Sequence, residues 1–303
     1  MKTTHLLLCL LLGCTAFTCN SGNNPAETAT AVSAPASASN DEVLTVFRHI
    51  DRVEAVNYQV TDPELDFREF PNGFYTSTTC HLMWPKTVYG KSSRKLEQAL
   101  IDVLTNTEGK FKSLDAALND ILQPLNNTPF ERNQMGSVKL IKAIPEDAGM
   151  NQSYFNVSLF PKSMDADICV FHFEKENYMG GAHGMNWDRY VNYDLKQDKV
   201  IQLTDLVADT VKLRQVITEA LFDKENVSSI AALNEEGYFI DDQYVPLTAD
   251  FYLEGFDIHF VYAPYAIASY SMGSVDVVIY PFQLDKAGIM TKYYNDLIGR
   301  YTR

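Results

Sequence analysis

Basic residues are scarce in this sequence, which holds 25 Lys and Arg against 39 Asp and Glu and carries a formal net charge of −14. This deficit argues against binding to nucleic acid and against electrostatic binding to anionic lipid headgroups. A basic partner is compatible with it, although acidity often serves solubility alone. Aromatic residues are plentiful, with 17 Tyr and 17 Phe, so the chain has ample material for a folded core.

The sequence also lacks an apolar run long enough to cross a membrane as a helix, which takes about 20 residues. The apolar run at residues 6–12 is too short, and its position after Lys2 is typical of a secretory signal. It ends in Leu11-Leu12-Gly13-Cys14, which resembles the bacterial lipobox that precedes a lipidated cysteine. We therefore predict a lipoprotein signal peptide at residues 1–13 and a lipid on Cys14. Lipidation of Cys19 and ordinary secretion are the alternatives.

Aromatic residues are missing from residues 20–40, which consist mainly of Ser, Gly, Asn, Pro, Ala and Thr and hold one charge, Glu27. Such a segment buries too little apolar surface to offset the entropy lost on ordering. Residues 14–40 are thus predicted to be a disordered tether between a membrane anchor and a folded body.

Cysteines are few, and only Cys80 and Cys169 lie in the predicted body. An exported protein meets an oxidising compartment, where such a pair can form a disulfide. A disulfide requires Cα atoms within about 7 Å, which the sequence does not reveal. A disulfide joining the halves of the chain and two separate buried thiols therefore both remain open.

Motifs of metal sites and of catalytic nucleophiles are absent. The sequence contains neither H-E-x-x-H nor C-x-x-C, and Ser271 lacks the flanking glycines of a nucleophile elbow. His172 and Glu174 are two residues apart and would share one face of a strand, while His259 lies in a later predicted strand. We predict no metal and no cofactor.

The periodicity of apolar residues predicts an α+β fold with antiparallel sheets, packed helices and two subdomains, at residues 41–150 and 151–303. Ser93 is a candidate N-cap for the first helix. The expected strands are 43–50, 53–60, 74–83, where Pro85 ends the strand, then 135–144, 153–160, 166–174, 190–195, 250–253, 257–263 and 274–280. The expected helices are 92–104, 113–125, 209–223 and 288–301.

A glycine-rich stretch, Gly180-Gly181-Ala182-His183-Gly184, separates two of the predicted strands. Glycine serves where the backbone needs a positive φ or a close approach. The stretch predicts a tight turn or bulge that holds His183 in place. A second predicted loop carries Tyr262, Tyr265 and Tyr270 between Pro264 and Gly273, where the rings could either contact a ligand or pin the loop to its own sheet.

The glycine turn, residues 190–196, residues 203–206 and the tyrosine loop at residues 262–273 together resemble a known family. It is the C-terminal envelope domain shared by the lysozyme-sensing anti-sigma factor RsiV and the peptidoglycan deacetylase PdaC, and the resemblance covers residues 151–284. Residues 44–125 more loosely resemble the accessory domain that often precedes it. The resemblance implies an extracytoplasmic α+β module. The deacetylase catalytic domain and the anti-sigma region have no counterpart here.

Two functions follow as hypotheses. In the first, a non-catalytic envelope lipoprotein, anchored to the membrane and facing the periplasm or the exterior, binds peptidoglycan or a lysozyme-like protein through Gly180, Gly181, His183 and the three tyrosines. In the second, a hydrolase acts on envelope polymers with His183 in its site. The hydrolase needs a cleft in which His183 meets a carboxylate or a serine within hydrogen-bond reach.

Overall fold

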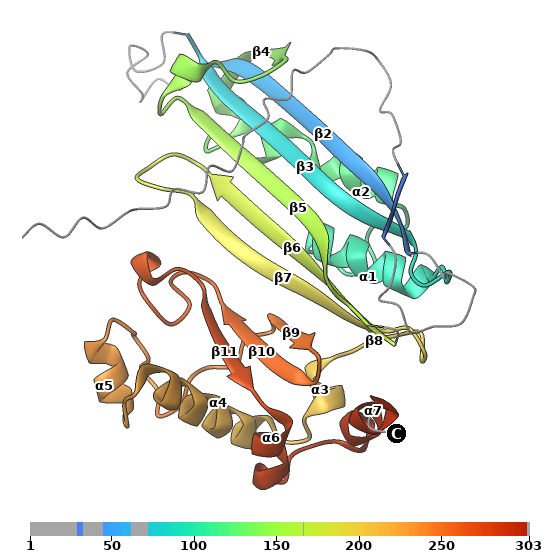
Figure 1. The fold of residues 1–303 in the computed structure, drawn as a ribbon. Helices are drawn as coiled ribbons and strands as arrows, with labels where there is room; N and C mark the ends of the chain where they lie inside the picture. The colour runs from blue at the N-terminus through green and yellow to red at the C-terminus, as the bar shows by residue number, and fades with distance from the viewer. Residues whose placement is uncertain (1–28, 33–44, 62–71, 166, 302–303) are drawn as a thin grey trace, which may run out of the picture.

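The computed structural model describes residues 29–32, 45–61, 72–165 and 167–301, and it forms two layers of sheet and helix (Figure 1). Both candidate lipidation sites, Cys14 and Cys19, lie outside these residues. None of the helices described there is both long and apolar enough to span a membrane.

The larger layer is an eight-stranded sheet with the order β1-β2-β3-β5-β6-β7-β8, in which β4 also pairs with β2. Its strands are β1 (Ala29–Val32), β2 (Thr45–Val60), β3 (Phe74–Thr87), β4 (Met135–Ile141), β5 (Gln152–Met164), β6 (Ile168–Tyr178), β7 (Met185–Asp194) and β8 (Lys199–Val200). One face is covered by α1 (Arg94–Thr105) and α2 (Leu114–Ile121), which form a core with it (Figure 1). Short 3-10 turns follow at Pro124–Asn126, Arg132–Gln134 and Glu146–Ala148.

The smaller layer is a three-stranded antiparallel sheet with the order β11-β10-β9, surrounded by the later helices (Figure 1). Its elements are α3 (Leu203–Leu206), α4 (Thr210–Glu225), α5 (Ile230–Glu235), β9 (Phe251–Glu254), β10 (Asp257–Tyr262), a 3-10 turn at Tyr270–Met272, β11 (Val275–Ile279), α6 (Pro281–Ala287) and α7 (Lys292–Tyr301). These elements enclose a second core. The α+β class is therefore confirmed.

Several details of the predicted fold are corrected. The strands expected at residues 43–50 and 53–60 form one strand, β2, because no glycine or proline interrupts it. Pro85 does not end β3, since it sits where the β2–β3 register shifts and its missing N–H is tolerated there. The helix expected at residues 288–301 begins only at Lys292, as α7, because Gly288 in the left-handed conformation ends a separate helix, α6. α3, α5 and α6 were not predicted.

The large sheet also differs from the prediction in its pairing and in its extent. β3 and β5 pair in parallel, which the long connection through α1 and α2 allows. This pair joins the two predicted subdomains, so the change from one sheet to the other falls after β8 and not at residue 150. Within the predicted tether, residues 29–32 form β1 on the edge of β2, where open backbone groups favour strand addition.

Cys80 and Cys169 are both buried as free thiols. β5 lies between their strands, and Cys80 pairs with Val157 of β5 whereas Cys169 pairs with Met164, so the two are offset along the sheet. Burial raises the pKa of Cys80 to about 11 and that of Cys169 to about 12. Of the two alternatives left open by the sequence, the structure contains the separate buried thiols.

Candidate functional site

The predicted glycine turn connects β6 to β7. Gly180 and Gly181 have φ values of 95° and 98°, a region that L side chains rarely adopt, so the tight turn is confirmed. The Tyr178 hydroxyl donates a hydrogen bond of 2.9 Å to the Gly181 carbonyl and closes the turn. Gly184 is needed for a different reason, because a Cβ there would lie 2.6 Å from the backbone oxygen of Asn177.

His183 is exposed at this turn and meets two tyrosines of the second predicted loop. Its ring stacks on Tyr270 with centroids 3.9 Å apart and planes at 19°, and on Tyr265 at 6.1 Å and 26°. The Tyr265 ring is also 5.6 Å from that of Tyr270. His183, Tyr265 and Tyr270, which we call the aromatic site, thus come together from segments more than 80 residues apart, as the 82-residue separation of the His183–Tyr265 contact shows.

Hydrogen bonds fix the orientation of the His183 ring. Nδ1 lies 2.9 Å from the carbonyl oxygen of Gly184, and because a carbonyl oxygen accepts, Nδ1 carries the donated proton. Nε2 then accepts from the Tyr265 hydroxyl at 3.3 Å. Tyr265 is 49% exposed and has a φ of 70°, so its backbone adopts an uncommon conformation that presents the ring to solvent.

Tyr262 does not join the aromatic site. Its side chain is only 2% exposed, belongs to the core of the smaller layer and donates a hydrogen bond of 2.8 Å to the Pro246 carbonyl. Burial raises the pKa of its hydroxyl. Tyr262 therefore pins the loop to its own sheet, while on the same loop Tyr265 is exposed and Tyr270 is half-buried.

A second pair of rings extends the aromatic surface on the β5–β6 side. Tyr154 stacks on Tyr178 with centroids 5.7 Å apart, and its hydroxyl donates to Glu176 at 2.9 Å. Burial, followed by the Glu176 carboxylate, raises the pKa of Tyr154 to about 12. Tyr154 thus links the glycine turn to the polar surface of the sheet.

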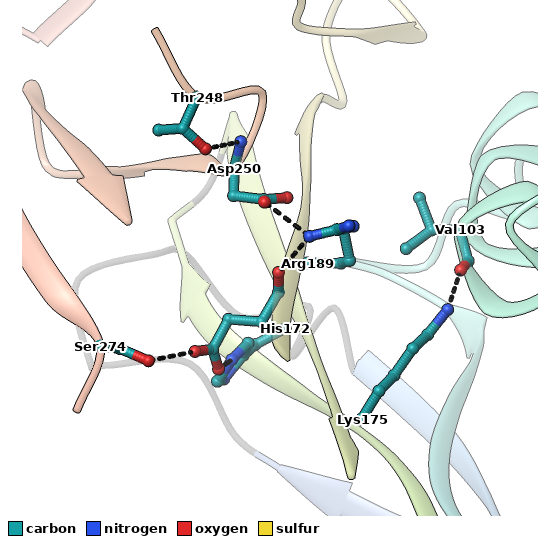
Figure 2. A network of polar contacts seen from close by, with 8 residues as sticks. Val103, His172, Lys175, Arg189, Thr248, Asp250 and Ser274 are labelled. Carbon is teal, nitrogen blue, oxygen red and sulfur yellow. Dashed lines mark hydrogen bonds and ion pairs between the residues drawn. The ribbon is translucent and has the colours of Figure 1, made fainter. Parts of the chain in front are cut away.

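That polar surface contains an open cleft of about 360 Å³ on the large sheet. Asn156, Ser158, Glu174, Lys175, Glu176, Asn186, Trp187, Asp188 and Ser274 line it. At its edge the Nε2 atom of His172 lies 2.6 Å from Oδ1 of Asp188, and the Ser274 hydroxyl donates to the other oxygen of Asp188 at 3.3 Å (Figure 2). Carboxylates from two strands and the serine that directly precedes β11 therefore meet beside a histidine.

Basic side chains near the cleft are held by other partners (Figure 2). Arg189 pairs with Asp250 at 2.5 Å, and Lys175 donates to the carbonyls of Val103 and Leu104 at the end of α1, at 2.5 and 3.0 Å. Burial lowers the pKa of Lys175 to about 8 and raises that of Asp250, which Arg189 opposes. These pairs connect β6 and β7 to the neighbouring elements.

His183, Tyr265 and Tyr270 were predicted from the sequence as site residues, and His172 and Glu174 were considered as metal ligands. Asp188 was not singled out. The missing information was strand register, which places Asp188 opposite Glu174. His259, considered with His172, does not contact Asp188 or Glu174. It is linked to His172 by the stacked rings of Tyr190 and Tyr252, and its own partners are Asp276 and Glu254. Polar residues at alternate positions of β7 were the one available signal for Asp188.

The model of a protein family of unknown function, DUF3298, matches residues 194–280. A solved DUF3298 family member from Bacteroides fragilis aligns with a TM-score of 0.60 and 18% identity, over 84% of this chain and 96% of that protein. A DUF3298 family protein from Pseudomonas aeruginosa aligns with a TM-score of 0.49 and 16% identity, over 82% and 95%. No curated protein matches the chain.

The Bacteroides fragilis structure supports the fold and carries no activity. The family model and this structure support one part of the resemblance expected from the sequence. The chain is similar to a domain family whose function is unknown. The closer relation to RsiV and PdaC stays a prediction. The family match includes Tyr265 and Tyr270 and begins after His183.

Proposed function

We propose that the protein is a non-catalytic binding protein of the bacterial cell envelope that engages a cell-wall glycan, or an envelope or host protein such as a lysozyme, through the aromatic site. The observation that carries this proposal is the stack of His183 on Tyr270, flanked by Tyr265, on two exposed loops. Tyrosine offers a large amphipathic contact area at small entropic cost, and tyrosines are enriched in protein interfaces.

The surroundings of the aromatic site favour binding because they hold the rings in place before a ligand arrives. The positive φ of Gly180 and Gly181 defines the turn that carries His183. Tyr262 anchors the tyrosine loop in the core. A surface ordered in advance loses less entropy on association, which raises affinity.

The hydrolase hypothesis gains no support from the contacts of His183. Within the part of the chain that the structure describes, His183 forms hydrogen bonds with a backbone carbonyl and with a tyrosine hydroxyl. General acid–base chemistry would need a carboxylate or a serine at that distance. Binding is therefore the better-supported function.

Single substitutions in the aromatic site test the binding function. Tyr265→Ala and Tyr270→Ala should each weaken binding about 10-fold or more, as expected for aromatic anchors at the centre of an interface. The probes are co-sedimentation with purified peptidoglycan and calorimetric titration with a lysozyme, which distinguish glycan from protein. Phe282→Ala is the matched control, because this ring is 68% exposed on α6 and stacks on Tyr280. Equal affinities of all three variants and the parent would refute the assignment.

The proposed anchor has its own test. If the lipid is attached to Cys14, Cys14→Ser moves the protein from the membrane fraction to the soluble envelope fraction, while Cys19→Ser leaves it on the membrane. The reverse pattern assigns the lipid to Cys19. Release by neither substitution would contradict a lipid anchor at either residue.

A further inference from the structure

His172, Glu174 and Asp188, which we call the triad, lie on one face of the β6–β7 pair. Glu174 is directly opposite Asp188 in the strand register, and His172 precedes Glu174 by two residues and so projects from the same face. One ligand atom from each residue lies within 4.8 Å of the other two. Ligand atoms that bind one metal ion at about 2.0–2.2 Å lie closer to one another than 4.8 Å. Modest rotation of the side chains would therefore be needed to form the site.

The imidazole of His172 is held ready for a ligand. The residue is 7% exposed, and its ring stacks on Tyr190 at 4.6 Å and 10° and makes a T-shaped contact with Phe160 at 4.8 Å. Its Nε2 atom points at Asp188. A donor whose rotamer is locked by packing binds with little loss of side-chain entropy.

The charge of the triad is not balanced by neighbouring cations. Among the residues that the structure describes, Asp188 forms an ion pair with His172 and with no other residue, and Glu174 forms none. Lys175 and Arg189, the adjacent basic residues, are engaged by the end of α1 and by Asp250. Two carboxylates therefore converge on a neutral or singly charged imidazole, an arrangement that a divalent cation would stabilise.

We propose that the triad binds one divalent transition-metal ion of the Zn²⁺ type. One imidazole nitrogen and two carboxylate oxygens are a ligand set that suits zinc and its neighbours better than magnesium or calcium, which prefer oxygen alone. Glu174 and Asp188 line the 360 Å³ cleft, which leaves room for water or a further ligand at an open coordination position. Ser274, the residue before β11, orients Asp188 through its hydroxyl.

A second histidine in the structure provides the contrast. His259 also has two carboxylates, but Asp276 lies 3.0 Å from its Nδ1 atom and Glu254 lies 3.5 Å from its Nε2 atom. Because the two carboxylates approach opposite nitrogens of the ring, they cannot meet on one ion. His259 also stacks on a tyrosine, Tyr252, at 4.4 Å, so Glu254→Gln is a matched control for a carboxylate beside a stacked histidine.

Calorimetric titration of the chelator-treated full chain with Zn²⁺ tests the proposal, which is independent of the aromatic site. The parent and Glu254→Gln should bind one ion per chain, and Glu174→Gln and Asp188→Asn should each bind at least about 10-fold more weakly. Both substitutions keep side-chain shape, and circular dichroism checks that the variants fold. Absence of binding by the parent, or unchanged binding by both triad variants, would overturn the proposal. With Co²⁺ in place of Zn²⁺, the absorption spectrum of the parent should differ from that of Asp188→Asn.

Discussion

At the scale of single residues, the neighbours of each histidine determine its role. His183 is exposed and stacks on tyrosines, so it contributes surface. His172 is buried with one carboxylate on Nε2, so it contributes a ligand atom. His259 is held by carboxylates at both nitrogens, so it contributes a link between β9, β10 and β11. No local sequence pattern separates these three environments, because each histidine sits in or beside a strand.

The glycine turn allows a prediction at this scale. Gly184→Ala should destabilise the protein by about 1–3 kcal/mol, because its Cβ would meet the Asn177 carbonyl oxygen at 2.6 Å and force the hairpin to shift. Gly181→Ala should cost about 1–2 kcal/mol through its positive φ alone, since no atom lies within 4 Å of the added Cβ.

Urea unfolding of the two variants measures these costs against His183→Ala. That exposed substitution should change the free energy of unfolding by no more than about 0.5 kcal/mol. A Gly184→Ala protein as stable as His183→Ala would show that the turn accommodates a side chain, and the steric account of Gly184 would then be wrong.

At the scale of elements, local signals predicted α1 well. Ser93 was expected as its N-cap, and the Ser93 hydroxyl accepts from the Leu96 N–H at 3.1 Å. The same hydroxyl also lies 2.6 Å from Asp198 and 2.7 Å from the Tyr193 hydroxyl, contacts that depend on tertiary structure and that no local pattern reveals. Hydrogen bonds from Ser93 and Tyr193 lower the pKa of Asp198.

Strand pairing was the part of the fold that the sequence left undetermined. Alternation predicted strands near the observed β3, β5, β6 and β7, but period-two patterns say nothing about which strands are neighbours. The parallel β3–β5 pair and the Glu174–Asp188 pairing are both consequences of register. The aromatic site was predictable because each of its two loops carries its own glycine or proline signal.

At the scale of the whole molecule, one core crosses the predicted domain boundary. The core beneath α1 and α2 includes Leu100 and Leu118 from the first half, and Val157, Phe171 and Tyr193 from the second. The other core is built almost entirely from elements after β8. The structural division thus separates the eight-stranded sheet from the three-stranded sheet, near the point where the family match begins at residue 194.

This division predicts how truncated chains behave. A chain of residues 41–150 should fail to fold, because it lacks β5, β6 and β7, exposes the paired edge of β3 and loses the apolar side chains that cover α1. A chain of residues 41–303 keeps both cores and should unfold cooperatively. Circular dichroism and urea titration of the two chains provide the measurement. A cooperative transition in the 41–150 chain would show that β2, β3, α1 and α2 suffice for a core, and that residue 150 is a true domain boundary after all.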